Sequence, residues 1–189
     1  MESVSLDIAT FYNTYDNLRT LEAGAPYLVF VPTPYVVAPF TADNRMDGRT
    51  YGAELAANWV AADWWRFRGA YTLLQMDLEP DGNSADVTSE NAEDESPHNQ
   101  FSLRSSIDLT ESIEVDAGLR YVDRLPGLDI ANYTGFDLRL AYRPTDNLEF
   151  ALVGQDVLRA THREYSPFFT SSSASKIERS VYLQVTLRF

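Results

Sequence analysis

Alternation between apolar and polar residues is the dominant pattern along this chain. In residues 134–143 one set of alternate positions is apolar and the other is mostly charged. Successive side chains of a β-strand point to opposite faces of a sheet, so this period of two predicts a strand with one apolar and one polar face. The same pattern predicts eight strands, at residues 3–12, 51–60, 65–74, 99–109, 113–123, 134–143, 148–154 and 178–189. We therefore expect an all-β fold.

The connections between the expected strands are of two alternating kinds. Three are short and similar, at residues 62–66, 110–114 and 145–149, and each carries an acid at its second position, which suits a tight turn. The others are long, at roughly 23–47, 79–97, 124–132 and 160–177. Outer-membrane barrels have short periplasmic turns and long extracellular loops. We therefore predict that both ends of the chain lie on the short-turn, periplasmic side.

The apolar face of each strand can contact lipid or pack inside a soluble core. Alternation alone leaves β-sandwiches and lipocalin-like barrels open. Aromatic residues near the strand ends, such as Tyr12, Trp59, Trp64 and Phe189, are typical of the girdles that mark a membrane interface. No apolar run approaches the length of a membrane-spanning helix, so a membrane crossing would use strands. We predict an antiparallel transmembrane β-barrel segment.

The polar faces of neighbouring strands carry charges of both signs. Such residues are Arg104, Asp108, Glu114, Asp116, Arg120, Asp137, Arg139 and Glu149. This pattern indicates a polar lumen with ion pairs across the strands. A solvated outer face of a soluble protein would give the same pattern.

Composition excludes several functions. The formal net charge of −13 disfavours binding to nucleic acid, whose affinity comes largely from basic side chains on phosphates. The chain has no cysteine, so it offers neither disulfides nor a thiolate metal site. The only histidines, His98 and His162, lie in separate expected loops without a triad-like arrangement of serine and acid. We expect no enzymatic activity, no catalytic residue and no bound cofactor.

The segment 77–95 is rich in carboxylates and has no basic residue. Its weak candidates for calcium ligands are Asp81, Asp86, Glu93 and Asp94, because hard cations prefer oxygen ligands. The spacing of these acids fits no EF-hand loop. A solvated extracellular loop is the alternative, and the sequence assigns no metal site.

Two of the expected loops carry aromatic residues where an outer-membrane receptor would contact its ligand. Exposed rings often anchor recognition. The candidates are Tyr27, Phe30, Tyr35, Phe168 and Phe169. Packing of these rings on one another, to order the loops, is the alternative.

Four segments in order, at 7–19, 48–55, 153–158 and 178–189, resemble those of TonB-dependent receptors, and the resemblance covers almost the whole chain. It implies an outer-membrane receptor that imports siderophores, vitamin B12 or other scarce nutrients with energy relayed from the inner membrane. Such barrels have about 22 strands around an N-terminal plug. Neither a plug nor a signal peptide is recognisable here. We therefore expect residues 1–189 to form a single barrel domain, the C-terminal third of a larger barrel.

The resemblance also implies partners and an assembly signal. The last strand, with Tyr182, Val185, Leu187 and the terminal Phe189, is similar to the segment read by the barrel assembly machinery, although Leu183-Gln184 replaces a frequent glycine. Outer-membrane lipid and lipopolysaccharide would surround the barrel, and TonB would act only through a plug. The alternative is a free-standing eight-stranded outer-membrane barrel with a structural, adhesive or small-ligand-binding role, its interior filled by side chains.

Overall fold

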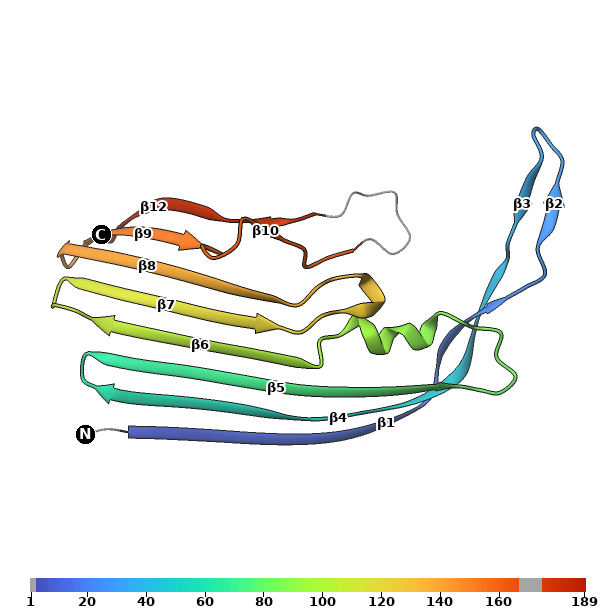
Figure 1. The fold of residues 1–189 in the computed structure, drawn as a ribbon, viewed down its shortest axis with the longest axis horizontal. Coiled ribbons are helices and arrows are strands. Elements are labelled where there is room, and N and C mark those ends of the chain that lie inside the picture. Colours follow the sequence, from blue (N-terminus) through green and yellow to red (C-terminus); the bar gives the residue numbers. More distant parts are fainter. Residues whose placement is uncertain (1–2, 167–174) are drawn as a thin grey trace.

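One large antiparallel sheet forms most of the molecule (Figure 1). The computed structural model describes residues 3–166 and 175–189. From one edge to the other, the sheet contains β1 (Ser3–Ala23), β4 (Phe40–Ala62), β5 (Trp65–Pro80), β6 (Asn99–Asp108), β7 (Ile113–Val122), β8 (Tyr133–Thr145), β9 (Leu148–Gln155) and β12 (Ser180–Leu187). Every neighbouring pair is antiparallel. The predicted all-β class and the eight strands are confirmed.

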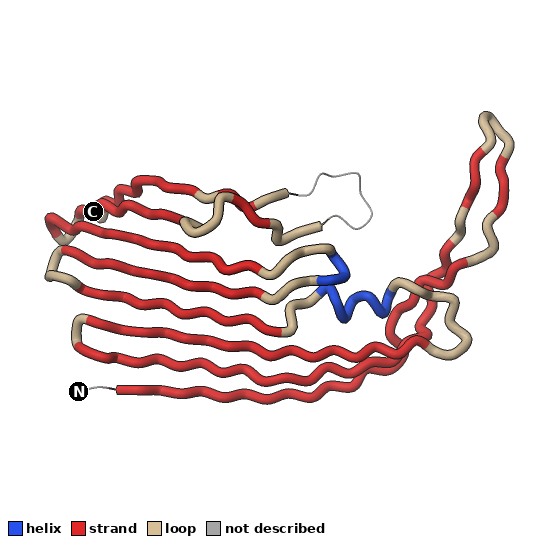
Figure 2. Tube along the Cα trace, viewed as in Figure 1, coloured by secondary structure: helices blue, strands red, loops and turns tan. Residues whose placement is uncertain are grey.

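The remaining elements are short and lie in the connections between the sheet strands. They are β2 (Tyr27–Val29), β3 (Tyr35–Val37), the 3-10 helices η1 (Ser89–Glu95) and η2 (Pro126–Leu128), β10 (Thr161–His162) and β11 (Ile177–Glu178). β2 pairs with β3, and β10 pairs with β11. Figure 2 shows how little of the described chain is helical.

Among the described residues, no helix combines the length and the hydropathy needed to cross a membrane.

The short turns and the long connections lie at opposite ends of the sheet, as predicted. The β4–β5, β6–β7 and β8–β9 turns lie at the end where Figure 1 marks both N and C. The other end carries the β2–β3 hairpin, η1, η2 and the β10–β11 pair. We refer to these as the short-turn end and the loop end.

The predicted long loop at 23–47 is wrong in its bounds, because β4 already begins at Phe40. β1 likewise runs past its predicted end at residue 12 and reaches Ala23, the first residue of that loop. Their ladder runs on to the pair Ala23 and Phe40, beyond an irregularity at Asn17, whose φ is 58°. Asparagine tolerates this left-handed conformation better than most residues. β5 likewise extends to Pro80 and contains part of the expected acidic loop. Both faces of these extensions carry polar residues, so the sequence there lacks the alternation that marks a half-apolar strand.

The sheet buries few apolar side chains and leaves one apolar face open. Val4, Leu6 and Ile8 alternate on β1, and each is at least 60% exposed. Strands paired on both sides show the same feature, since Leu140 of β8 and Leu152 of β9 are 46% and 51% exposed. Such a continuous apolar surface on a soluble monomer would be an aggregation hazard, whereas lipid covers it in an outer-membrane barrel.

Candidate functional site

The opposite face of the sheet is polar, and we call it the polar face. Cross-strand pairing places Arg68, Arg104 and Gly118 in one row, and Asp116 opposite Arg139 on the same face. Ala151 of β9 lies opposite Ala141 on this face. Glu149, two residues before Ala151 on the same strand, therefore points to the same face. The charges that the sequence suggested for a polar lumen therefore lie together on one face.

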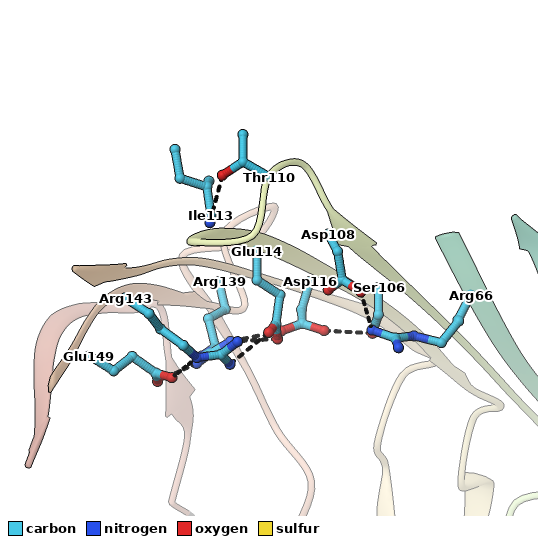
Figure 3. A network of polar contacts seen from close by, with 10 residues as sticks. All are labelled: Arg66, Ser106, Asp108, Thr110, Ile113, Glu114, Asp116, Arg139, Arg143 and Glu149. Atoms are coloured by element: carbon cyan, nitrogen blue, oxygen red, sulfur yellow. Dashed lines mark hydrogen bonds and ion pairs between the residues drawn. The ribbon is translucent and has the colours of Figure 1, made fainter. Parts of the chain in front are cut away.

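An ion-pair network occupies the polar face near the short-turn end (Figure 3). Arg139 Nη1 lies 3.0 Å from Glu114 Oε1 and 3.0 Å from Asp116 Oδ2, and its Nη2 lies 2.5 Å from Glu149 Oε1. Arg143 bridges Glu114 and Glu149, each at 2.7 Å. Two arginines thus hold three carboxylates across β7, β8 and β9, which ties these strands together by side chains as well as by the backbone ladder.

Small residues make room for this network. Ala141 and Ala151 lie opposite each other on β8 and β9, and both are fully buried. Ala141 also lies opposite Glu114 of β7. The side chains of Glu114, Arg139 and Glu149 therefore extend over the methyl groups of these alanines. They are themselves mostly shielded from solvent.

A second cluster fastens the β9–β12 connection to the loop end of the sheet. Arg120 Nη2 and His162 Nε2 lie 2.9 Å and 2.8 Å from the same oxygen, Oε1 of Glu164. The rings of Tyr133 and His162 stack with their centroids 4.4 Å apart, and the Arg120 guanidinium lies over Tyr133. Burial alone would raise the pKa of Glu164, but hydrogen bonds from His162 and Tyr133 and the charge of Arg120 lower it. The cluster orders a segment that sequence alone presents as a loop.

The carboxylate of Asp86 holds the acidic connection between β5 and β6 in place by hydrogen bonds. Its carboxylate accepts hydrogen bonds from the backbone N–H groups of Leu21, Thr88 and Ser89 and from the hydroxyls of Thr88 and Ser89. Burial alone would raise the pKa of Asp86, but these hydrogen bonds outweigh it and bring the pKa well below its ordinary value. Glu22 of β1 accepts hydrogen bonds from Ser84 and Ala85 in the same way.

The other calcium candidates are spread over this connection. Glu93 accepts a hydrogen bond from the backbone N–H of Leu78, and Asp81 uses its backbone N–H to bond the carbonyl of Arg45. Asp94 lies in η1, which packs against η2 near Gly127. In the described part of the chain, no three acidic or histidine side chains come together as a metal site would require. The carboxylates of Asp86 and Glu93 are instead bonded to backbone N–H groups.

The aromatic candidates of the first long connection lie on the β2–β3 hairpin, which projects from the loop end (Figure 1). Tyr27, Phe30 and Tyr35 are all exposed, Phe30 by 68%. No charged residue occurs between Glu22 and Asp43. The rings are therefore available for contact at the loop end. The other two candidates, Phe168 and Phe169, lie outside the described residues.

The candidate assembly signal lies on β12, an edge strand of the sheet, and on the residues that follow it. Val185 and Leu187 lie opposite Phe150 and Leu148 on the apolar face, whereas Tyr182 lies opposite Val153 on the polar face. Phe189 follows the strand and is fully exposed. The four residues therefore divide between both faces of the edge strand.

Aromatic side chains form a band on the apolar face close to the short-turn end. Trp59 stacks on Phe67 with centroids 5.2 Å apart, and Trp65 lies 4.7 Å from the same ring. The indole N–H of Trp65 donates to Ser105 Oγ at 2.9 Å. An apolar ring with a satisfied polar group suits a membrane interface, which is the position predicted for Trp59 and Trp64.

Known proteins with similar sequences are outer-membrane β-barrels, as the apolar and polar faces of this sheet suggest. Residues 2–157 match the family described as "TonB dependent receptor-like, beta-barrel". The chain belongs to this family. The resemblance found in the sequence is thereby confirmed, and with it the bacterial outer-membrane location and the antiparallel barrel class of the TonB-dependent receptors.

Solved structures share this fold over nearly the whole chain. The siderophore receptor PiuA from Acinetobacter baumannii is 20% identical with a TM-score of 0.74, and the match covers 97% of this chain and 26% of PiuA. The ferric-catecholate import receptor Fiu from E. coli K12 is 20% identical with a TM-score of 0.67, covering 98% and 25%. The iron transporter FrpB from Neisseria meningitidis is 14% identical with a TM-score of 0.67, covering 98% and 29%. This chain thus spans about a quarter of the length of these structures.

Sequence reasoning missed the role of Glu164, which links Arg120 to His162. Arg120 was assigned to a polar face, and His162 was noted only as an isolated histidine. The separation of 44 residues between Arg120 and Glu164 gave no signal of contact. The acid two positions after His162 is the only local cue.

Proposed function

We propose that this chain is the C-terminal part of the barrel of a TonB-dependent receptor that imports siderophores or other scarce nutrients across the outer membrane. The observation that carries the proposal is the sheet itself, which has an apolar exposed face, a charged opposite face and two edges that are unpaired within the described residues. A sheet of this kind forms a section of a wide barrel wall. Its charged face would then border the lumen through which the nutrient passes.

The free-standing eight-stranded barrel is the alternative, and it requires β1 to pair with β12. These strands lie at opposite edges of the described sheet. They are also unequal in length, with 21 residues in β1 and 8 in β12. In a larger barrel, additional strands would pair with the free backbone N–H and C=O groups of β1 and β12. This arrangement does not require strands of such unequal length to pair with each other, so it favours the receptor.

The proposed partners follow from the position of each part. Lipid and lipopolysaccharide would cover the apolar face, and the barrel assembly machinery would read the final strand with Val185, Leu187 and Phe189. TonB would act through a plug domain in the full-length protein. The exposed rings of Tyr27, Phe30 and Tyr35 would contact the nutrient at the loop end before it enters the lumen.

Nutrient uptake by cells tests this proposal. A strain that lacks the gene would be supplied with radiolabelled ferric catecholate and hydroxamate siderophores or vitamin B12, with and without active TonB. We expect the gene to restore uptake of one of these compounds only when TonB is active. TonB-independent uptake, or no difference from the deletion strain for any compound, would contradict the proposal.

The β2–β3 hairpin allows a sharper comparison. The triple variant Tyr27→Ser, Phe30→Ser, Tyr35→Ser should lower uptake about tenfold or more, because aromatic rings that become buried against a ligand dominate recognition. The matched control is Trp64→Ser, which removes an exposed ring at the opposite, short-turn end. Equal uptake by the triple variant and the control would exclude ligand contact by the hairpin and leave the rings a role in ordering the loop.

A further inference from the structure

Arg68 of β5 and Arg104 of β6 lie directly opposite each other on the polar face. Like charges in opposite positions of an antiparallel pair destabilise a sheet. Neither guanidinium has a carboxylate partner among the described residues. The described ion pairs of the polar face engage other arginines, including Arg66 with Asp108 and Arg120 with Glu164, both at 2.9 Å. The opposed arginines therefore have no ion pair of their own among the described residues.

The other residues paired directly with these two arginines are uncharged. In the same row, Asn58 lies opposite Arg68, and Gly118 lies opposite Arg104. Asp137 comes next, opposite Gly118, and its Oδ1 accepts the backbone N–H of Asp156 at 2.9 Å. The nearest acid in the row is thus separated from Arg104 by a whole strand and is bonded to the backbone.

A hollow of about 650 Å3 opens above the two arginines. Small side chains such as Ala70 and Ser102 border it near the two arginines. Its remaining charged lining consists of Arg120, Asp137, Asp156 and Glu178. At Gly118 an added Cβ would meet only the Cβ of Asp137, at 3.9 Å, so the glycine leaves open space beside Arg104. The volume falls within the range of small-molecule sites.

We propose that Arg68 and Arg104 form a binding site for a carboxylate group, to which the two guanidinium groups on adjacent strands donate hydrogen bonds. Guanidinium groups bind carboxylates through paired hydrogen bonds, and a carboxylate between them would remove their mutual repulsion. The carboxylate belongs either to a polypeptide segment within the lumen or to a dissolved solute. The site rests on the proposed function only in that the polar face borders the lumen.

The test compares Arg104→Gln with Arg104→Lys in the full-length protein that carries this chain, purified in detergent. Both substitutions remove the guanidinium, and only lysine keeps the charge. The apparent Tm of each variant is measured in chloride buffer, with citrate as the carboxylate probe in a second series. Arg179→Gln and Arg179→Lys serve as controls, because Arg179 is exposed and lies outside the main sheet.

A carboxylate from the protein makes the glutamine variant less stable than the lysine variant, by about 1–3 °C, without citrate. If the carboxylate comes from a solute, the Tm of the glutamine variant without citrate equals or exceeds that of the lysine variant. Citrate then raises the Tm of the lysine variant more than that of the glutamine variant. If the Tm of the glutamine variant equals or exceeds that of the lysine variant both with and without citrate, the proposal is overturned. No transport is measured, so the result is independent of the proposed nutrient uptake.

Discussion

Arg139 of β8 and Glu149 of β9 form an ion pair in which Nη2 and Oε1 are 2.5 Å apart. The same guanidinium also binds Glu114 and Asp116 of β7. Arg139 therefore contacts all three carboxylates of the network, whereas Arg143 contacts only Glu114 and Glu149.

Replacing Arg139 by leucine should lower the free energy of unfolding by about 3 kcal/mol, because removing one partner of a shielded ion pair leaves charge uncompensated. The uncompensated charge is mainly that of Asp116, since Arg143 still pairs with Glu114 and Glu149. Urea unfolding in lipid vesicles, followed by tryptophan fluorescence, measures this change. Arg66→Leu is the control, since its pair with Asp108 is more exposed and should contribute less than about 1 kcal/mol. Equal losses in the two variants would show that the network adds no stability beyond a surface pair.

The assignment of the two faces can be tested on adjacent residues of β6. Leu103 is on the apolar face, and Ser102 is on the polar face. Leu103→Arg should cost about 2–4 kcal/mol, because an arginine facing lipid near the middle of the membrane is unfavourable. Ser102→Arg should cost less than Leu103→Arg, since it faces the polar side. Its only added penalty there is the like charge of Arg120 opposite it, about 1 kcal/mol or less. The same unfolding measurement applies, and a larger loss for Ser102→Arg would mean that the faces are reversed.

Asp86 should make the β5–β6 connection sensitive to acid. Its pKa is lower in the folded protein than in the unfolded chain, so its contribution to stability is fully present above the ordinary aspartate value. The contribution is lost as the pH falls through the folded pKa. Hydrogen exchange at the Thr88 and Ser89 amides, corrected for the intrinsic effect of pH, should rise in strong acid.

Asp86→Ala removes the acceptor and should open the same segment at neutral pH, because a hydrogen bond to a charged group contributes about 2 kcal/mol. Asp81→Ala is the matched control, since Asp81 contributes its backbone N–H to the bond with Arg45. Protection of Thr88 and Ser89 that survives in Asp86→Ala would refute the role of this carboxylate.

Deletion of Phe189 should impair insertion of the barrel into the outer membrane. The side chain follows β12 and is fully exposed, so its loss removes no packing from the described fold. The amount of heat-modifiable barrel on a gel measures correct assembly in cells. Phe189→Tyr keeps an aromatic terminus and should assemble normally. A normal heat-modifiable barrel in the deletion would remove Phe189 from the signal.

Several features of this chain were predictable from sequence because they are local. A strand with one apolar face repeats every two residues, so the eight strands of the sheet could be recognised one by one. The short turns after Ala62, Asp108 and Thr145 were recognisable because tight turns favour acids and small polar residues. Alternation of short and long connections then predicted that both termini lie at the short-turn end.

The extent of β1 and β4 was not predictable, because their far ends are polar on both faces. Backbone hydrogen bonds with a neighbouring strand create these extensions, and such bonds need no particular side chain. Asp86 and Glu93 were ambiguous for a similar reason, since a carboxylate can bind a cation or a backbone N–H equally well. Only the folded arrangement of the loop identifies which donors reach these two acids.

The sequence by itself determined which residues face lipid and which face the polar side, since this division follows from the geometry of a single strand. The tertiary structure decided which charges meet. Arg139 reaches Glu114 across 25 residues of chain, and Arg120 reaches Glu164 across 44. Arg68 and Arg104 are left facing each other. These outcomes depend on the register between strands, which is set by all the pairings of the sheet together and leaves no trace in any one segment.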